Sequence, residues 1–310
     1  NSGARIRIVA QSHFGATVGD WIFQNSSGIT IEGVEATTRI RFEDSDDFAI
    51  LHTEANHVYV IRGENFEIRN NIVDTSWPNP ININESRNFF VTNNMFVGST
   101  NDAVQWQGVT DFVLERNACY GVSIPLGSSA HPDACQIRDS FGIRPANSTI
   151  RRNMFWDTSN PGGEKGAQGL YLEAVGANML VEENIGQLKL TDVGVRLRAV
   201  PLTIRNNCMM GAILVNNQGG AASQVQVTDN VTSAVGQEYS TGNDGESLGI
   251  TVSGNIETDS TGTSGVLTLW GTGEDWRHYK AIASGPADSG DARYGQAFIA
   301  QLEAEAAARA

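Results

Sequence analysis

The chain has 310 residues, of which 40% are hydrophobic and 18% charged, and a formal net charge of −14 at pH 7. This acidic balance argues against nucleic acid as a partner, because phosphate binding needs clustered lysine and arginine. No apolar run approaches the roughly 18 residues that span a membrane, so we expect no membrane insertion. The composition favours a protein that is extracellular, either secreted or on a virion surface.

Alternating apolar residues begin close to the N-terminus. Because Asn1–Ala4 stand directly before an alternating segment, Arg5–Val9, we expect the chain to be a piece of a longer one. Trp21-Ile22-Phe23 and then Ile29-Thr30-Ile31 follow as strand candidates. The acidic run Glu43–Asp47 lacks the spacing of an EF-hand calcium loop and predicts a solvated loop.

A short phrase that ends in asparagine then repeats through most of the chain. Its first copy, Phe66-Glu67-Ile68-Arg69-Asn70-Asn71, alternates apolar and polar residues, which is the period of a strand. The last asparagines of the copies are Asn71, Asn94, Asn117, Asn153, Asn184, Asn207, Asn230 and Asn255. The steps between them are 23, 23, 36, 31, 23, 23 and 25 residues, and a basic period of this size predicts a solenoid.

A second strand precedes the phrase in each repeat. These upstream segments place apolar residues on both sides of an outward residue, as in Ile81–Ile83, Val104–Trp106, Cys135–Ile137, Leu170–Leu172 and Val195–Leu197. A strand that returns with the same phase every 23 residues predicts coils stacked in parallel at about 4.8 Å. We expect the asparagines to hold one corner of each coil, through a left-handed backbone and a ladder of side-chain amides.

This pattern resembles the right-handed parallel β-helix of the pectate-lyase-like superfamily and of phage tailspikes, over most of residues 5–270. The resemblance implies an all-β fold, a parallel β-helix solenoid with a short C-terminal α-helix. We expect the β-helix over residues 1–270 and a C-terminal loop and helix over 271–310. That helix caps the last coil or meets a neighbouring subunit. A homotrimer or a larger virion assembly is one alternative that the resemblance leaves open.

Two successive coils are longer than the basic period, by 13 and 8 residues. We expect the insertions at about 118–132 and 154–167, with Gly121–Pro132 and Ser159–Lys165 rising on adjacent coils to wall a groove. Repeat proteins commonly place such insertions on their binding face.

Aligned upstream strands predict two columns of outward side chains beside this groove. The first contains Asn82, Gln105, Gln136, Tyr171 and Arg196, and the second contains Asn84, Gln107, Arg138, Glu173 and Arg198. Planar amides and guanidinium groups at strand spacing suit sugar hydroxyls and carboxylates. The columns therefore predict binding of a polysaccharide or cell-surface glycan, with Asn82, Gln105, Gln107, Gln136, Arg138, Arg196 and Arg198 as substrate-binding residues. Polar ladders that only solvate the sheet are the alternative.

An Asp-Ala-x-Gln phrase occurs twice, at Asp102 and at Asp133, and places these two carboxylates side by side. Such a pair can hold Ca²⁺, share a proton, or act as a retaining glycosidase pair. The candidate catalytic residues are Asp133 with His131, Tyr171 and Glu173, and the candidate metal ligands are Asp102 and Asp133. In the alternative interpretation, both aspartates cap the turns that enter their strands.

The resemblance leaves the activity open. The Asp-Pro-His-Asp motif of mannuronan C5-epimerases and the Gly-His-Gly motif of polygalacturonases are both absent. We expect spike-like or adhesin-like glycan recognition, with lyase or hydrolase activity as an open addition. The alternatives are a secreted polysaccharide lyase or C5-epimerase-type enzyme, and a purely structural β-helix subunit.

Overall fold

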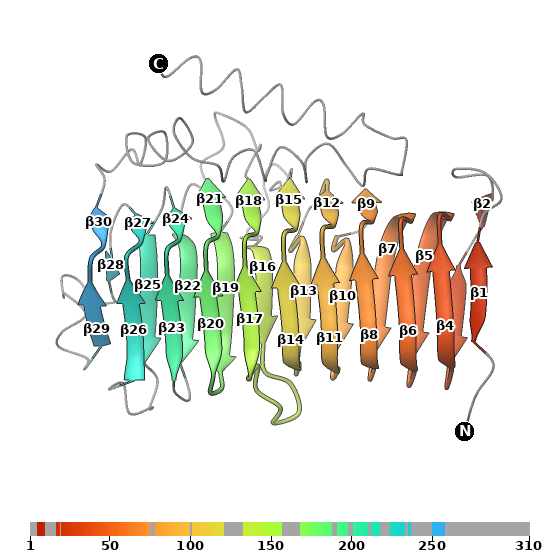
Figure 1. The fold of residues 1–310 in the computed structure, drawn as a ribbon, viewed down its shortest axis with the longest axis horizontal. Coiled ribbons are helices and arrows are strands. Elements are labelled where there is room, and N and C mark those ends of the chain that lie inside the picture. The colour runs from red at the N-terminus through yellow and green to blue at the C-terminus, as the bar shows by residue number, and fades with distance from the viewer. Residues whose placement is uncertain are drawn as a thin grey trace, which may run out of the picture.

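The computed structural model describes residues 5–9, 17–18, 20–74, 78–99, 101–120, 133–156, 168–187, 191–197, 201–209, 212–217, 224–232, 235–236 and 250–257. These residues form a parallel β-helix (Figure 1). In Figure 1 one row of strands points up in front, another points down behind it, and later coils lie further left, so the superhelix is right-handed. The predicted C-terminal segment, 271–310, lies outside the described residues.

The asparagine phrases form the front row of Figure 1, here called the phrase row. It consists of β1 (Ile6–Val9), β4 (Ser27–Glu32), β6 (Asp46–Leu51), β8 (Glu64–Arg69), β11 (Arg87–Thr92), β14 (Thr110–Glu115), β17 (Ser148–Arg151), β20 (Met179–Glu182), β23 (Leu202–Arg205), β26 (Val225–Thr228) and β29 (Ile250–Ser253). Neighbours pair in parallel, for example Phe89 with Phe66 and with Phe112.

The predicted second strands form the upstream row, which lies behind the phrase row in Figure 1. It consists of β3 (Trp21–Gln24), β5 (Glu35–Glu43), β7 (Glu54–Ile61), β10 (Ile81–Asn84), β13 (Val104–Gln107), β16 (Asp133–Arg138), β19 (Gln168–Val175), β22 (Thr191–Leu197), β25 (Ala212–Asn217) and β28 (Val235–Gly236). Every predicted upstream segment lies in one of these strands, so that prediction is confirmed.

A third strand, which the sequence did not predict, follows the asparagine in most coils. This short row consists of β2 (Thr17–Val18), β9 (Ile72–Asp74), β12 (Met95–Val97), β15 (Ala118–Tyr120), β18 (Met154–Trp156), β21 (Ile185–Gln187), β24 (Cys208–Met209), β27 (Val231–Thr232) and β30 (Ile256–Glu257). In the N-terminal coils the long strands β5 and β7 pair with both the short and the upstream rows. The two rows are therefore continuous there and separate further along.

The acidic run Glu43–Asp47 belongs to this early part of the superhelix. Glu43 ends β5, and Asp46 begins β6, so the prediction of a solvated loop is wrong. Ile31 pairs with Ile50 and Ile50 with Ile68, at steps of 19 and 18 residues rather than 23. These coils are shorter because no separate corner divides the short row from the upstream row.

The asparagine ladder is confirmed. Asn94 Nδ2 donates to Asn117 Oδ1 at 2.9 Å, Asn117 Nδ2 donates to Asn153 Oδ1 at 3.0 Å, and the chain of bonds runs from Asn71 to Asn255. The ladder asparagines from Asn71 to Asn230 are 0–1% exposed. The left-handed backbone was predicted one residue too late. It belongs to the preceding residue, as at Asn93 (φ 55°) and Arg116 (φ 56°).

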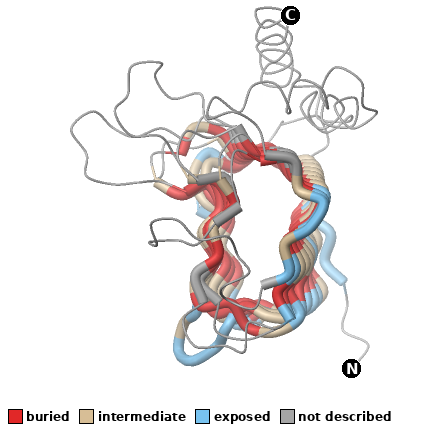
Figure 2. The backbone as a smooth tube through the Cα atoms, turned by 90° about the vertical axis from the view of Figure 1, so that its left-hand side faces the viewer, coloured by how far each residue is buried: buried red, intermediate tan, exposed pale blue. Residues whose placement is uncertain are grey.

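Alternating apolar side chains fill the interior of the coils, where Figure 2 shows the buried residues along the superposed strands. Phenylalanines at equivalent positions stack along the axis, with ring centroids 3.9 Å apart for Phe42–Phe48, 4.6 Å for Phe48–Phe66 and 4.7 Å for Phe66–Phe89. Such offset stacks add about 0.5–1.5 kcal/mol per pair beyond burial. The core therefore fixes the same register as the asparagine ladder.

The two long coils differ from the others at one shared corner. Tyr120 pairs with Trp156 and Asp133 pairs with Gln168, so the segments 121–132 and 157–167 leave and re-enter the superhelix on adjacent coils. This agrees with the predicted placement, while the segments themselves lie outside the described residues.

Part of the first insertion was assigned to the wrong place. Trp106 precedes Val113 by 7 residues, whereas their partners Ile137 and Thr149 are 12 apart, so five extra residues lie between β16 and β17. They form the loop that projects at the lower edge of Figure 1.

Candidate functional site

The upstream row positions the predicted first column as expected over three coils. Asn82 pairs with Gln105, Gln105 with Gln136, and Gln136 with Tyr171. Because successive residues of a strand point to opposite faces, these side chains point outward while their neighbours Ile83, Trp106 and Ile137 fill the core.

Arg196 does not continue this column, so its predicted place is wrong. Tyr171 pairs with Gly194, and the register then shifts between Leu172 and Val175, where Ala174 has a φ of 57°. A bulge of this kind sets two residues against one. The side chain of Arg196, all of Arg198 and the candidate base His131 lie outside the described residues.

The amides of the first column bond mainly to one another. Asn82 Nδ2 donates to Gln105 Oε1 at 2.9 Å, and Gln105 Nε2 donates to Asp102 Oδ2 at 2.9 Å. Asn82 Oδ1 lies 2.9 Å from His57 Nε2. Burial lowers the pKa of His57, so the ring is neutral at pH 7 and Nε2 carries the proton that it donates. Asn82 and Gln105 therefore form a ladder, as the alternative interpretation of the columns holds.

The column one turn earlier explains Asp102. Asp102 N donates to Asn79 Oδ1 at 3.2 Å, and Asp133 N donates to Asp102 Oδ1 at 3.0 Å. At this position each side chain therefore accepts the backbone N–H of the next coil. Asp102 is 4% exposed and acts as a cap, which the alternative interpretation of the aspartates predicted.

Asp133 departs from this capping pattern. It is 0% exposed, and its Oδ2 accepts from Gln136 Nε2 at 3.2 Å, but its Oδ1 has no hydrogen-bond partner in the described chain. Burial, with a further contribution from the charges of Asp102 and Glu173, raises the pKa of Asp133 to about 8. Asp133 is therefore mostly protonated at neutral pH, beside a carboxylate that is fully hydrogen-bonded.

The calcium prediction needs more ligands than this pair provides. Ca²⁺ takes six to eight oxygen ligands, whereas both oxygens of Asp102 already accept hydrogen bonds. Within the described ranges no three His, Cys, Asp or Glu side chains are grouped as metal ligands.

The second predicted column is more accessible than the first. Asn84 pairs with Gln107 and Gln107 with Arg138, and all three side chains are partly exposed. With the Gln107 amide oriented oxygen-first, its Oε1 accepts from Arg138 Nη2 at 2.6 Å and from Nε at 3.3 Å. Glu173 is partly exposed and follows Leu172, which pairs with Ile137, whereas Tyr171 is only 8% exposed.

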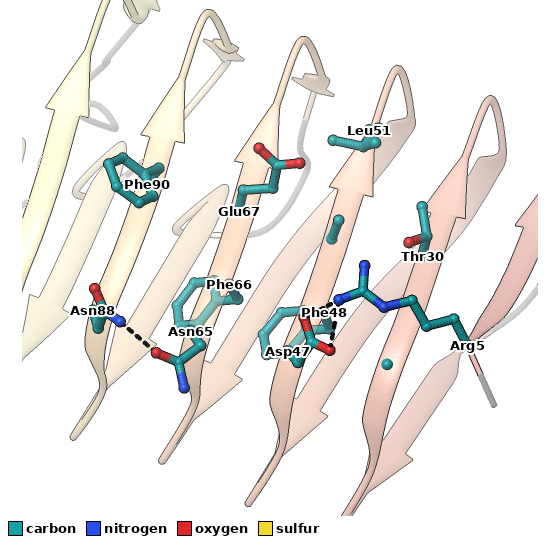
Figure 3. A pocket seen from close by; sticks show the side chains of 12 residues that line it. Arg5, Thr30, Asp47, Phe48, Leu51, Asn65, Phe66, Glu67, Asn88 and Phe90 are labelled. Carbon is teal, nitrogen blue, oxygen red and sulfur yellow. Dashed lines mark hydrogen bonds and ion pairs between the residues drawn. The ribbon is translucent and has the colours of Figure 1, made fainter. Parts of the chain in front are cut away.

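A shallow hollow on the opposite sheet was missed by the sequence reasoning. It lies over β4, β6, β8 and β11 of the phrase row and has a volume of about 380 Å³ (Figure 3). The signal for it was Phe90, an aromatic residue at an outward position of a phrase, which is 50% exposed.

In the described part of the chain, no helix has the length and apolarity needed to cross a membrane.

Comparison with known proteins gives a likeness of fold. No protein-family model and no curated protein matches the sequence. The crystal structure of PfbA, a surface adhesin of Streptococcus pneumoniae, is similar with a TM-score of 0.49 and 12% sequence identity. The match covers 76% of this chain and 63% of that chain, so this chain spans less than two thirds of the adhesin's length. The described residues themselves show the fold class, an all-β, right-handed parallel β-helix.

Proposed function

We propose that the protein recognises an extended acidic polysaccharide, in the manner of a spike or an adhesin, along the accessible second column of the upstream row. The binding residues are Gln107 and Arg138, with Asn84 and Glu173 at either end. Their partly exposed planar groups repeat at the strand spacing of about 4.8 Å, which suits successive hydroxyl and carboxylate groups of a polymer.

The Arg138 guanidinium is the observation that carries this proposal. It uses two of its five N–H donors on Gln107 Oε1 and stays partly exposed. A guanidinium held in place by one partner can grip a carboxylate bidentately with its remaining donors. It also offers local positive charge on a protein whose net charge is −14, which an acidic glycan needs.

Binding to immobilised acidic polysaccharides tests the proposal. Polygalacturonate, alginate and hyaluronate are suitable probes, measured by biolayer interferometry at physiological salt. We expect Arg138→Ala to weaken binding by about tenfold or more, and Arg138→Lys to recover it only in part, because lysine lacks the planar fork. Arg87→Ala is the matched control, since Arg87 is exposed and paired to Glu64 on the phrase row. Equal binding by Arg138→Ala and Arg87→Ala would rule out this face.

Cleavage or modification of the same polymer is a second candidate function, which the state of Asp133 favours. A buried carboxyl group that keeps its proton at neutral pH can act as a general acid, as in glycosidases. In hydrolysis, Asp133 gives its proton to the glycosidic oxygen as the C–O bond breaks. Water then adds to the anomeric carbon and returns a proton to the carboxylate.

Reducing ends and unsaturated products, measured with the same three polymers, test this activity. We expect Asp133→Asn to abolish turnover while polymer binding stays. Asp111→Asn is the control, because Asp111 is an exposed aspartate on the phrase row. Turnover that persists in Asp133→Asn, or no turnover by the wild-type protein, removes the catalytic assignment.

The proposal places the protein outside the cell or on a surface, where such polymers are met. The trimer and the larger virion assembly stay predictions, which light scattering coupled to size-exclusion chromatography measures.

A further inference from the structure

The hollow on the phrase row is built by a change in side-chain size along one outward column. Thr30 pairs with Ala49, Ala49 with Glu67, and Glu67 with Phe90. The small side chains of Thr30 and Ala49 leave space on the sheet surface, and the half-exposed ring of Phe90 borders it. Figure 3 shows Phe90 at one end of the hollow and Arg5 at the other.

Charged groups around the hollow are compensated within it. Arg5 Nη2 lies 3.2 Å from Asp47 Oδ2, and Arg69 Nε lies 3.8 Å from Glu67 Oε2. The Glu67–Arg69 distance exceeds that of a hydrogen bond, so the partly exposed Glu67 carboxylate can still accept from a ligand. A ligand with a net charge of either sign gains little from such a lining.

Two asparagines extend the polar rim. Asn88 Nδ2 donates to Asn65 Oδ1, and Asn65 Nδ2 donates to Asp46 Oδ1 at 2.9 Å. These bonds hold both amides in place, and no described residue donates to Asn88 Oδ1. The hollow therefore combines one aromatic face with fixed hydrogen-bonding groups, and its volume of about 380 Å³ lies at the lower end of small-molecule sites.

We propose that this hollow is a second binding site, for a neutral sugar ring. The apolar face of the ring packs on Phe90, and its hydroxyl groups donate to Glu67 and Asn88 while accepting from Arg5. This inference goes beyond the proposed function, because the site lies on a different sheet and takes an uncharged ligand. A polyhydroxylated ring matches the lining because it offers an apolar face and hydroxyl donors together without a net charge.

Isothermal titration with neutral hexasaccharides tests this site. Cellohexaose, maltohexaose, laminarihexaose and chitohexaose serve as probes, with saturation-transfer NMR to show which ring protons contact the protein. We expect at least one of them to bind, Phe90→Ala to weaken that binding by about tenfold or more, and Phe90→Trp to retain it. Glu67→Gln should weaken binding less than Phe90→Ala, because the amide oxygen still accepts.

Leu180→Ala is the matched control, since Leu180 occupies the same outward column of the phrase row far from the hollow. Arg138→Ala separates the two sites. We expect it to leave neutral-sugar binding unchanged, whatever happens to acidic polymers. The proposal is overturned if none of the four hexasaccharides binds, or if Phe90→Ala binds as well as Leu180→Ala.

Discussion

Replacement of Asn117 by alanine should remove more stability than almost any other single polar substitution in this chain. The Asn117 amide donates to Asn153 Oδ1, Val91 O and Glu115 O at 2.9–3.0 Å, and its oxygen accepts from Asn94 N and Nδ2 at 3.0 and 2.9 Å. All of this lies in the interior, with Asn117 1% exposed.

The expected loss follows from these five bonds. A typical hydrogen bond contributes about 0.5–1.5 kcal/mol net, and a buried donor left without a partner costs about 1–3 kcal/mol. Because the amide shares its hydrogens among three acceptors, we expect a total of about 3–5 kcal/mol rather than the full sum. Guanidinium chloride unfolding, followed by far-UV circular dichroism and tryptophan fluorescence, measures it.

Asn147→Gly is the matched control. Asn147 also belongs to an amide ladder, bonding to Asp111 and Asn178, but it is exposed and has a φ of 53°, which glycine adopts without strain. We expect a loss of less than about 1 kcal/mol there, because water replaces the lost bonds. If Asn117→Ala costs no more than Asn147→Gly, the ladder does not hold the coils together.

Two further predictions concern ionised groups. Burial raises the pKa of Asp133 from an ordinary value of 3.8 to about 8, so the stability that its proton contributes is full below about pH 4 and is lost as the pH rises towards about 8. Asp133→Asn should flatten that decline in a series of unfolding curves, and an unchanged slope would show that Asp133 is not its source. Arg151→Ala should destabilise the fold by about 1–2 kcal/mol, and less at 1 M salt, because Arg151 pairs at 3.0 Å with Glu115 and adjoins Glu182, both 8% exposed. The exposed pair of Arg87 should be worth less than about 0.5 kcal/mol, and equal losses for the two arginines would contradict this reasoning.

The sequence predicts the phrase row and the ladder because each coil repeats one physical requirement. The corner asparagine must satisfy two backbone groups and two neighbouring amides, which leaves few other residue types acceptable at Asn94, Asn117 or Asn153. The short row was not predicted because strands of two or three residues, such as β12, are too short to show alternation.

The position of Arg196 was not predictable by counting residues. The bulge at Ala174 changes the register after Leu172, although alanine carries no sequence signal for a left-handed backbone. An alignment that assumes equal spacing therefore places Arg196 beside Tyr171, where the structure has Gly194.

The role of the polar columns also depends on facts that a pattern does not contain. Asn82 and Gln105 read as ligand-binding amides, yet their groups bond to each other and to His57 and Asp102. Only the three-dimensional positions distinguish such a self-satisfied ladder from the more accessible column of Gln107 and Arg138.

A crystal structure with a bound acidic hexasaccharide tests the central claim most directly. The account predicts a sugar carboxylate against Arg138, with the polymer crossing β13, β16 and β19 along the accessible column. A hexasaccharide bound elsewhere on the superhelix, with Arg138 still turned only to Gln107, would contradict it.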